Sequence, residues 1–212
     1  MKYYPIYLDL RERPCVVIGG GRVAERKALS LLEAGADVTV VSPSLSPKLR
    51  ELAASGKVLH LPKAFEEKDL AGAFLVIAAT DSLEVNSATG RLCRKQHILV
   101  NVAAPPEEGC FIVPSVVEQG DLLIAVSTGG VSPALSHRIR RELEEKYGPE
   151  YGLFLHRMAA VRKRLLEEVK DEDVRKGALQ AIVDSDVMEL LKQGKTQEAE
   201  HRIWEIAGLK PK

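Results

Sequence analysis

A run of apolar residues, 14–18, ends at three consecutive glycines, Gly19, Gly20 and Gly21, and apolar residues at helical spacing follow directly. The run is short and rich in valine and isoleucine, which is typical of a buried strand in a parallel sheet. The helical spacing continues to Gly35, a residue type that commonly ends helices. A strand, a glycine turn and a helix in this order predict the first unit of an α/β protein.

Strand-like and helix-like segments keep alternating up to residue 100. The sequence predicts further strands at 38–41, 58–61, 74–78 and 98–100, and helices at 46–56 and 82–96. Strands that alternate with helices form a parallel sheet, and right-handed crossovers place helices on both of its faces. We therefore expect an α/β fold with a Rossmann-like parallel sheet.

The pattern changes after Asn101. Two strand-like runs, 111–113 and 122–127, have no helix between them. From Pro133 onward the chain reads as helical, with helices predicted at 134–147, 178–191 and 196–207 and an apolar stripe from Phe154 to Val169. These changes predict three parts: a Rossmann domain over 1–113, a small strand-containing region over 114–149 and a helical carboxyl-terminal domain over 150–212.

Composition narrows the class of protein. The chain has 30 basic and 30 acidic side chains, so its formal net charge is zero, whereas a protein that binds a phosphate backbone usually has a basic excess. No apolar run approaches the roughly 20 residues that span a membrane, and the first residues lack an apolar signal core. The 3 cysteines have no paired spacing. We expect a cytoplasmic protein without nucleic-acid or membrane partners, disulfides or a cysteine-based zinc site.

The glycine turn has the spacing of a dinucleotide-binding motif, Gly19-x-Gly21-x-x-Ala24. Gly19 allows a tight turn, Gly21 lets the backbone approach a pyrophosphate, and Ala24 lets helix and sheet pack closely. The helix that follows offers free N–H groups and the positive end of its dipole. The motif therefore predicts a pyrophosphate site at this helix N-terminus.

The acidic residue that usually binds the adenosine ribose is missing. It should follow the second strand, where the sequence has Ser42, Pro43 and Ser44, while Asp37 precedes that strand. Lys48 and Arg50 come shortly after, either as contacts for a 2′-phosphate or as solvated helix charges. Spacing alone does not decide whether the cofactor is NAD or NADP.

Other polar residues follow the later strands. Thr80 and Asn101 lie at carboxyl ends of predicted strands, where open α/β sheets bind ligands, and Asp81 is interpreted as a helix N-cap. The loop that holds Ser127 and Thr128 is either an anion-binding loop or a serine-capped turn. The 5 histidines show no metal-ligand spacing, so no metal site is expected.

The combined motifs resemble the precorrin-2 dehydrogenase family, which also forms the amino-terminal part of siroheme synthases. The resemblance covers about the first 145 residues in collinear order. It is carried by Pro5-Ile6, Leu10-Arg11, Val17 to Lys27, Ala78 to Asp81, Val85-Asn86, Asn101-Val102, Phe111 to Ser115, Ala125 to Gly130 and Ser132-Pro133.

The resemblance implies an NAD-dependent oxidation of precorrin-2 to sirohydrochlorin, with ferrochelatase activity in some members. It implies a homodimer, with the dimerisation region at 114–149 and the substrate side at 150–212. NAD contacts are then expected at Gly19, Gly21, Arg22, Val23, Ser42, Pro43, Ser44, Thr80 and Asn101. The tetrapyrrole, a polycarboxylate, is expected at Ser127, Thr128, Arg138 and Arg140, because arginine matches carboxylates well. The arginines are also open to interpretation as a solvated helix face.

One departure from the family pattern affects the chemistry. Many members read Asn-Val-x-Asp where this chain has Ala104 at the last position, and that aspartate is the family's proposed base and is implicated in metal insertion. Alanine has no proton acceptor. Glu107 and Glu108 are candidate replacements for this acid. The resemblance also makes Thr128 a candidate catalytic residue, because it keeps a hydroxyl where the family has a serine before the two glycines. Iron insertion is in doubt. The alternative is a carrier or sensor that binds tetrapyrrole or NAD without turnover.

Overall fold

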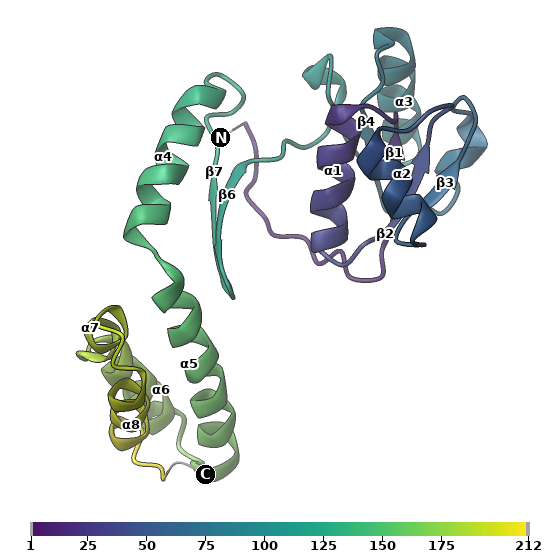
Figure 1. The fold of residues 1–212 in the computed structure, drawn as a ribbon. Helices are drawn as coiled ribbons and strands as arrows, with labels where there is room; N and C mark the ends of the chain where they lie inside the picture. Colours follow the sequence, from purple (N-terminus) through teal and green to yellow (C-terminus); the bar gives the residue numbers. More distant parts are fainter. Residues whose placement is uncertain (1, 211–212) are drawn as a thin grey trace. The chain divides into compact units, whose positions relative to one another are not determined.

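The structure, a computed structural model, describes residues 2–210 and divides into two compact units, Met1–Val113 and Pro114–Lys212 (Figure 1). Each unit has a hydrophobic core of its own. The further boundary expected after residue 149 falls at the first residue of a helix of the second unit, Pro149–Glu168, and stays a prediction.

The first unit holds a parallel five-stranded sheet in the order β3-β2-β1-β4-β5. Its strands are β1 (Pro14–Ile18), β2 (Asp37–Val41), β3 (Leu59–Leu61), β4 (Leu75–Ala78) and β5 (Leu99–Val102). Its helices are α1 (Arg22–Glu33), α2 (Pro47–Ala54) and α3 (Leu83–Lys95), with 3₁₀ turns η1 (Glu67–Leu70) and η2 (Pro106–Glu108). The α/β class and the parallel sheet expected from the sequence are confirmed.

Both faces of this sheet are covered, because alternate strand residues point to opposite sides. Val17 of β1 packs in one cluster with Ala24 and Ala28 of α1, and α2 joins the same cluster. Val16 of β1 packs in the other cluster with Cys93 of α3. The chain runs from β1 to β2 and β3 on one side of the sheet and from β4 to β5 on the other. Because both sets of crossovers are right-handed, their helices lie on opposite faces of the sheet (Figure 1).

The second unit begins with an antiparallel hairpin and continues as helices. Strands β6 (Ser115–Gln119) and β7 (Leu122–Val126) pair from Gln119↔Leu122 onward, across a two-residue turn in which Gly120 has φ 59°. The helices are α4 (Pro133–Lys146), α5 (Pro149–Glu168), α6 (Glu172–Val183), α7 (Val187–Lys192) and α8 (Thr196–Ile206). The helical core gathers side chains from α5 to α8, among them Val161, Ile182 and Ile203.

Two expected elements differ in the structure. Residues 111–113 are not a strand. This segment has only two isolated hydrogen bonds to β5, from the N–H of Cys110 and to the carbonyl of Phe111. The first hairpin strand starts after Pro114, which has no N–H to donate to a neighbouring strand. The helix expected over 178–191 is broken at Ser185, whose hydroxyl donates to the carbonyl of Ile182 at 2.7 Å and so competes with the helix.

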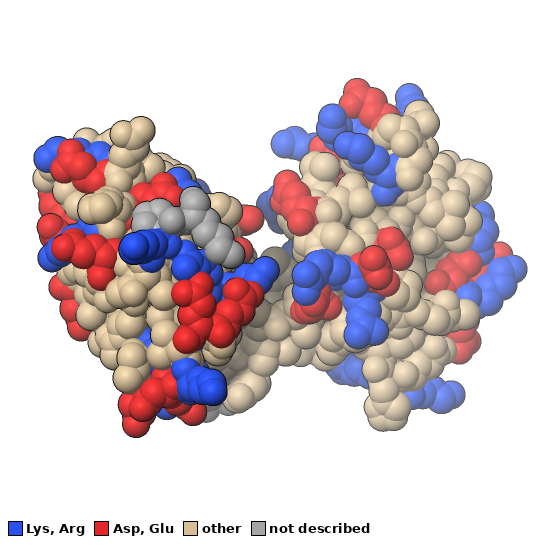
Figure 2. Space-filling view, turned by 90° about the horizontal axis from the view of Figure 1, so that it is seen from below, with Lys and Arg blue, Asp and Glu red and all other residues tan. Residues whose placement is uncertain are grey.

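Basic and acidic side chains are intermixed on the face shown in Figure 2, in keeping with the formal net charge of zero. Among residues 2–210, no helix combines the length and the apolar character that a membrane span requires.

Candidate functional site

The glycine turn lies where the order of the sheet reverses, between the carboxyl ends of β1, β2 and β4. A Cβ atom on Gly19, which has φ 120°, would lie 2.3 Å from the carbonyl oxygen of Ala79 after β4. A Cβ atom on Gly20 would lie 1.9 Å from the carbonyl oxygen of Ser44 after β2. Neither residue can carry a side chain without moving the neighbouring backbone. The sequence motif does not include Gly20, so only the run of three glycines indicated that a side chain is excluded there.

The third glycine has open space instead. No atom lies within 4 Å of a Cβ built on Gly21, the N-cap residue of the 12-residue helix α1, and no side chain caps the helix there. The first N–H groups of a helix have no partner within it, and they lie at the positive end of the helix dipole. Arg22 and Val23 at this end are exposed. An open helix N-terminus at the reversal point of the sheet fits the pyrophosphate of a dinucleotide.

The loop after β2 is fixed to the glycine turn. The hydroxyl of the buried Ser42 donates to the carbonyl of Ser44 at 2.7 Å, and the N–H of Ser46 donates to the carbonyl of Gly20 at 2.8 Å. Ser46 also donates its hydroxyl to the carboxylate of Glu25 on α1 at 2.6 Å, a contact that sequence reasoning missed. Pro43 and Ser44 are exposed. Together these bonds present a rigid, uncharged loop beside the helix N-terminus.

The two cations near this loop are engaged locally. Lys48 pairs with Glu51 at 3.0 Å, and Arg50 donates to the carbonyl of Leu45 at 3.3 Å. Both side chains are exposed on α2. The interpretation of these residues as solvated helix charges agrees with these contacts.

Thr80 follows β4 and is held by Asn86 of α3. The side-chain oxygen of Asn86 accepts from both the N–H and the hydroxyl of Thr80, at 3.0 and 2.8 Å. The expected N-cap, Asp81, is wrong, because the hydroxyl of Ser82 accepts from the N–H of Val85 and caps α3. Serine and aspartate cap equally well, so the sequence could not separate two neighbours of this kind.

Asn101 lies within β5, with its side chain nearly buried. Its amide donates to the carbonyl of Phe111 at 3.0 Å, which ties the segment that leaves the sheet back to its last strand. A role of Asn101 toward a cofactor stays a prediction.

The loop after β5 contains Ala104 and the two candidate carboxylates. Ala104 is half-buried, and Glu107 is exposed. The carboxylate of Glu108 lies 3.9 Å from Arg91 and 3.7 Å from Arg94, both on α3. Glu108 is thus held toward α3, whereas Glu107 has no ion pair among residues 2–210.

In the second unit, the expected substrate residues belong to one loop and helix. Thr128 closes the loop before α4: its hydroxyl donates to the carbonyl of Ser132 and accepts from the N–H of Ser132, both at 3.0 Å. The hydroxyl of Ser127 accepts from the N–H of Gly129 at 3.0 Å. These bonds form a turn, and Ser132 caps α4, as one of the two interpretations of this loop expected.

Arg138 and Arg140 lie on α4, and each is paired within the helix. Arg138 bonds Glu142 at 2.9 Å, and Arg140 bonds Glu144. Arg140 is the less exposed of the two. A carboxylate ligand would have to compete with these glutamates.

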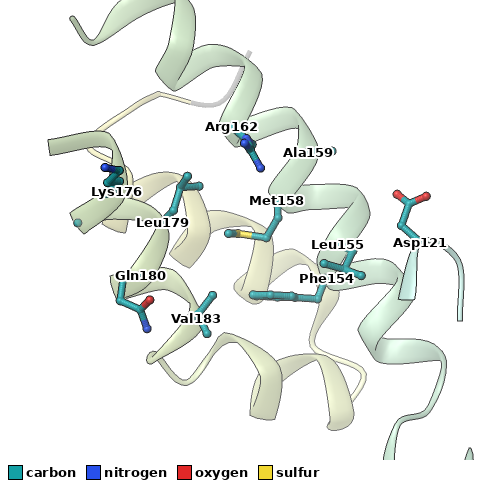
Figure 3. A pocket seen from close by; sticks show the side chains of 11 residues that line it. Asp121, Phe154, Leu155, Met158, Ala159, Arg162, Lys176, Leu179, Gln180 and Val183 are labelled. Atoms are coloured by element: carbon teal, nitrogen blue, oxygen red, sulfur yellow. The ribbon is translucent and has the colours of Figure 1, made fainter. Parts of the chain in front are cut away.

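A pocket of about 860 Å³ lies wholly within the second unit, between α5 and α6 (Figure 3). Its apolar lining includes Phe154, Leu155, Met158, Leu179 and Val183. Arg162, Lys176 and Asp121 also line it; Lys176 pairs with Glu172 at 2.7 Å, and Arg162 has no ion pair within the described chain. The sequence analysis missed this pocket, because a stripe such as Phe154 and Met158 reads simply as helix core.

No group of three or more His, Cys, Asp or Glu in the described part of the chain is arranged to hold a metal ion. The three cysteines are free, with Cys15 and Cys93 buried and Cys110 exposed. Burial raises the pKa of the Cys15 and Cys93 thiols to about 11.

Comparison with known proteins agrees with this geometry. The family described as putative NAD(P)-binding matches residues 6–115, and the sirohaem biosynthesis protein central family matches residues 119–146. A solved structure, "SirC, precorrin-2 dehydrogenase", superposes with a TM-score of 0.80 at 29% sequence identity, over 96% of this chain and 100% of that one. The chain belongs to the precorrin-2 dehydrogenase family.

Relatives of this family include longer proteins. A siroheme synthase of Methylobacillus flagellatus is 47% identical over 170 residues, which are 80% of this chain and 36% of the relative. A siroheme synthase of Methylococcus capsulatus is 37% identical over 207 residues, 98% of this chain and 44% of the relative. The chain therefore spans less than half of the length of these two relatives.

Proposed function

We propose that this chain is an NAD-dependent dehydrogenase that oxidises precorrin-2 to sirohydrochlorin in the cytoplasm. The observation that carries the proposal is the open helix N-terminus at Gly21, at the reversal point of a sheet in which Gly19 and Gly20 leave no room for a side chain. The structural likeness to a precorrin-2 dehydrogenase over 96% of the chain supports the choice of substrate.

The first unit would hold the dinucleotide. The N–H groups at Gly21, Arg22 and Val23 would bind the pyrophosphate, and the loop from Ser42 to Ser44 would contact the adenosine side. NAD is favoured over NADP because a 2′-phosphate would have to compete with the contacts that Lys48 makes with Glu51 and Arg50 makes with the carbonyl of Leu45. Thr80 and Asn101 would border the nicotinamide side. When bound, NAD supplies the acceptor for a hydride.

The oxidation removes a hydride and a proton from the substrate. With Ala104 in place of an acid, the chain's own proton acceptor would be Glu107, which is exposed and has no ion pair within the described residues. Glu108 is the weaker candidate, because Arg91 and Arg94 hold its carboxylate. The main contribution of the protein is then to hold the reacting carbon in the correct orientation.

The second unit would bind the polycarboxylate substrate. Thr128 and Ser127 would offer hydroxyl groups, and Arg138 and Arg140 would exchange their intrahelical glutamates for substrate carboxylates. The region 114–149 would form the interface of a homodimer. Iron insertion is not expected of this chain, because the side chain of Ala104 supplies no oxygen ligand.

A second candidate function follows from Ala104 alone. Without the family's acid, the chain would bind a tetrapyrrole or NAD as a carrier or sensor and would not turn over. Binding of both molecules without formation of NADH would favour this function over a dehydrogenase.

The deciding experiment is anaerobic mixing of precorrin-2, NAD and the protein. We expect NADH and the sirohydrochlorin spectrum to appear together and in equal amounts. Absence of both signals from protein that binds NAD would overturn the proposed reaction. NADP in place of NAD should give much slower turnover.

Variants of the loop after β5 test the proton acceptor. E107Q should lower turnover at least tenfold, since a positioned base contributes roughly 10²–10⁴-fold. E108Q is the matched control and should lower it less. A104D should raise turnover if proton removal limits the rate. An E107Q protein with full activity would show that Glu107 is not the base.

A further inference from the structure

One face of α3 lies against the loop that carries Ala104. Three residues spaced four apart, Asn86, Gly90 and Arg94, all contact this loop or the loop after β4. Residues at this spacing share one side of a helix. The face therefore supports the two loops on which the oxidation depends in the proposed function.

Asn86 makes the central contacts. It is 1% exposed, and its side-chain oxygen accepts from the N–H and the hydroxyl of Thr80. Its amide nitrogen donates to the carbonyl of Thr80 at 3.0 Å and to the carbonyl of Ala104 at 3.1 Å. Two acceptor and two donor positions are the full capacity of an asparagine side chain. Asn86 thus joins the loop after β4 to the loop after β5.

Gly90 and Arg94 hold the rest of the loop. A Cβ atom on Gly90 would lie 2.7 Å from the carbonyl oxygen of Glu108, so the loop backbone rests directly on the helix. The guanidinium of Arg94 donates to the carbonyls of Glu107 and Gly109. Three successive turns of α3 thus contact the loop, and Asn86 is the residue that bonds to Ala104.

We propose that Asn86 is a positioning residue for the oxidation, because it sets the spacing between the backbones of Thr80 and Ala104 at the carboxyl edge of the sheet. It has no free donor or acceptor with which to touch a reactant, so it acts through the two loops. This role rests on the proposed function. The open N-terminus of α1 at Gly21 belongs to another helix, and no hydrogen bond within the described residues joins Asn86 to Gly21.

Thr89 offers a matched control on the same helix. It is also polar and fully buried, and its hydroxyl donates to the carbonyl of Val85 at 2.8 Å, within α3. Thr89→Val keeps the shape and removes this single bond. It therefore perturbs α3 without touching either loop.

The test compares N86D and T89V with the unaltered protein by hydrogen exchange of peptides covering residues 79–82 and 103–110. The introduced carboxylate still accepts from the N–H of Thr80 but cannot donate to the carbonyls of Thr80 and Ala104. Exchange in peptide 103–110 should therefore become about tenfold faster in N86D, and exchange in peptide 79–82 should increase by less. Protonation gives the carboxyl one donor again. Acidification should therefore slow exchange in N86D, beyond the general pH effect measured in the unaltered protein. T89V should leave both peptides protected.

Kinetics give a second, independent readout. N86D should lower kcat at least tenfold and weaken NAD binding by a clearly smaller factor: Thr80 borders the nicotinamide side in the proposed function, whereas the N–H groups at the start of α1, which would bind the pyrophosphate, are not bonded to Asn86. T89V should change neither value. Unchanged exchange in N86D, or a loss of NAD affinity equal to the loss of kcat, would overturn the positioning role. If the unaltered protein oxidises no precorrin-2, the proposed function fails, and the exchange data still decide whether Asn86 joins the loops.

Discussion

Two neighbouring glycines have opposite surroundings, and this difference is measurable. A methyl group on Gly20 would meet the carbonyl oxygen of Ser44 at 1.9 Å, whereas one on Gly21 would meet nothing within 4 Å. G20A should lower the free energy of unfolding of the first unit by about 1–3 kcal/mol, the usual cost of overpacking. G21A should lower it by less than about 1 kcal/mol. Urea unfolding followed by labelling of the buried Cys15 measures both values.

For NAD binding we expect the opposite ranking, with G21A affected more than G20A. G21A places a methyl group in the space where the pyrophosphate would lie, so calorimetry should show a Kd for NAD at least tenfold weaker in a stably folded protein. Normal affinity in G21A would place the pyrophosphate elsewhere. Comparison with G20A, measured well below its unfolding midpoint, separates the loss of binding from the loss of folding.

The cysteines differ in reactivity at the residue scale. Burial, with a smaller effect of Asp37, raises the pKa of Cys15 to about 11, and burial with the nearby Cys110 does the same for Cys93. At about pH 8 both buried thiols should stay protonated and unreactive toward a thiol reagent, while Cys110 should react first. C110S should remove the fast phase. A fast phase that persists in C110S would contradict the burial of the other two.

The raised thiol pKa values also fix the direction of a pH effect on stability. Between the ordinary thiol pKa of about 8.5 and about 11, the folded chain holds protons that the unfolded chain has released. Stability is therefore fully present below about pH 8.5 and falls as the pH rises through this window. C15A should show a smaller decline of the urea midpoint than the unaltered protein.

At the scale of elements, the sequence could predict most of the Rossmann half. The valine-rich runs are short strands, buried except for the exposed first residues of β1 and β2 and the half-buried Thr39, and each is closed by glycine or a polar loop, so periodicity and turn residues indicate the same elements. The motif from Gly19 to Ala24 placed the helix N-terminus correctly. These features depend on local sequence, which a single chain displays directly.

Features that depend on contacts between distant segments could not be predicted. Gly20 is required by the carbonyl of Ser44, and the role of Asn86 by the carbonyl of Ala104, which lies 18 residues further on. The apolar lining of the pocket in the second unit resembles a core stripe in sequence, because exposure is decided by packing. The break at Ser185 did have a local signal, since Asp184-Ser185-Asp186 is a cluster of short polar residues.

The N-terminus of α6 provides a test at the element scale. The carboxylate of Asp171 accepts from the N–H groups of Asp173 and Val174, at 2.9 and 3.2 Å. D171A should lower the free energy of unfolding of the helical unit by about 1 kcal/mol, and D171N by less, because asparagine also caps. D173A removes the same charge from the first turn without removing the cap. Equal losses in D171A and D173A would assign the effect to the helix dipole instead.

At the scale of the whole molecule, two units with separate cores predict two separate responses to a ligand. Each unit contains one suitable reporter: Cys15 is fully buried in the first, and Trp204, the single tryptophan, packs against the helical core of the second. Trp204 also lies under the guanidinium of Arg164, 5.1 Å from its ring centre. Its fluorescence should therefore follow unfolding of the helical unit alone.

Addition of NAD at about 100 times its Kd should stabilise the unit that binds it by about 2.7 kcal/mol. In urea, labelling of Cys15 should then shift to higher denaturant, while the midpoint of the Trp204 transition stays unchanged. G21A, which is expected to weaken NAD binding at least tenfold, serves as the control: the same NAD concentration is then at most about 10 times its Kd, so its stabilisation should be at most about 1.4 kcal/mol and its shift of Cys15 labelling about half as large or smaller. A Trp204 midpoint that moves together with the Cys15 midpoint would show that the two cores unfold as one cooperative body, so that NAD binding in the first unit also stabilises the helical unit.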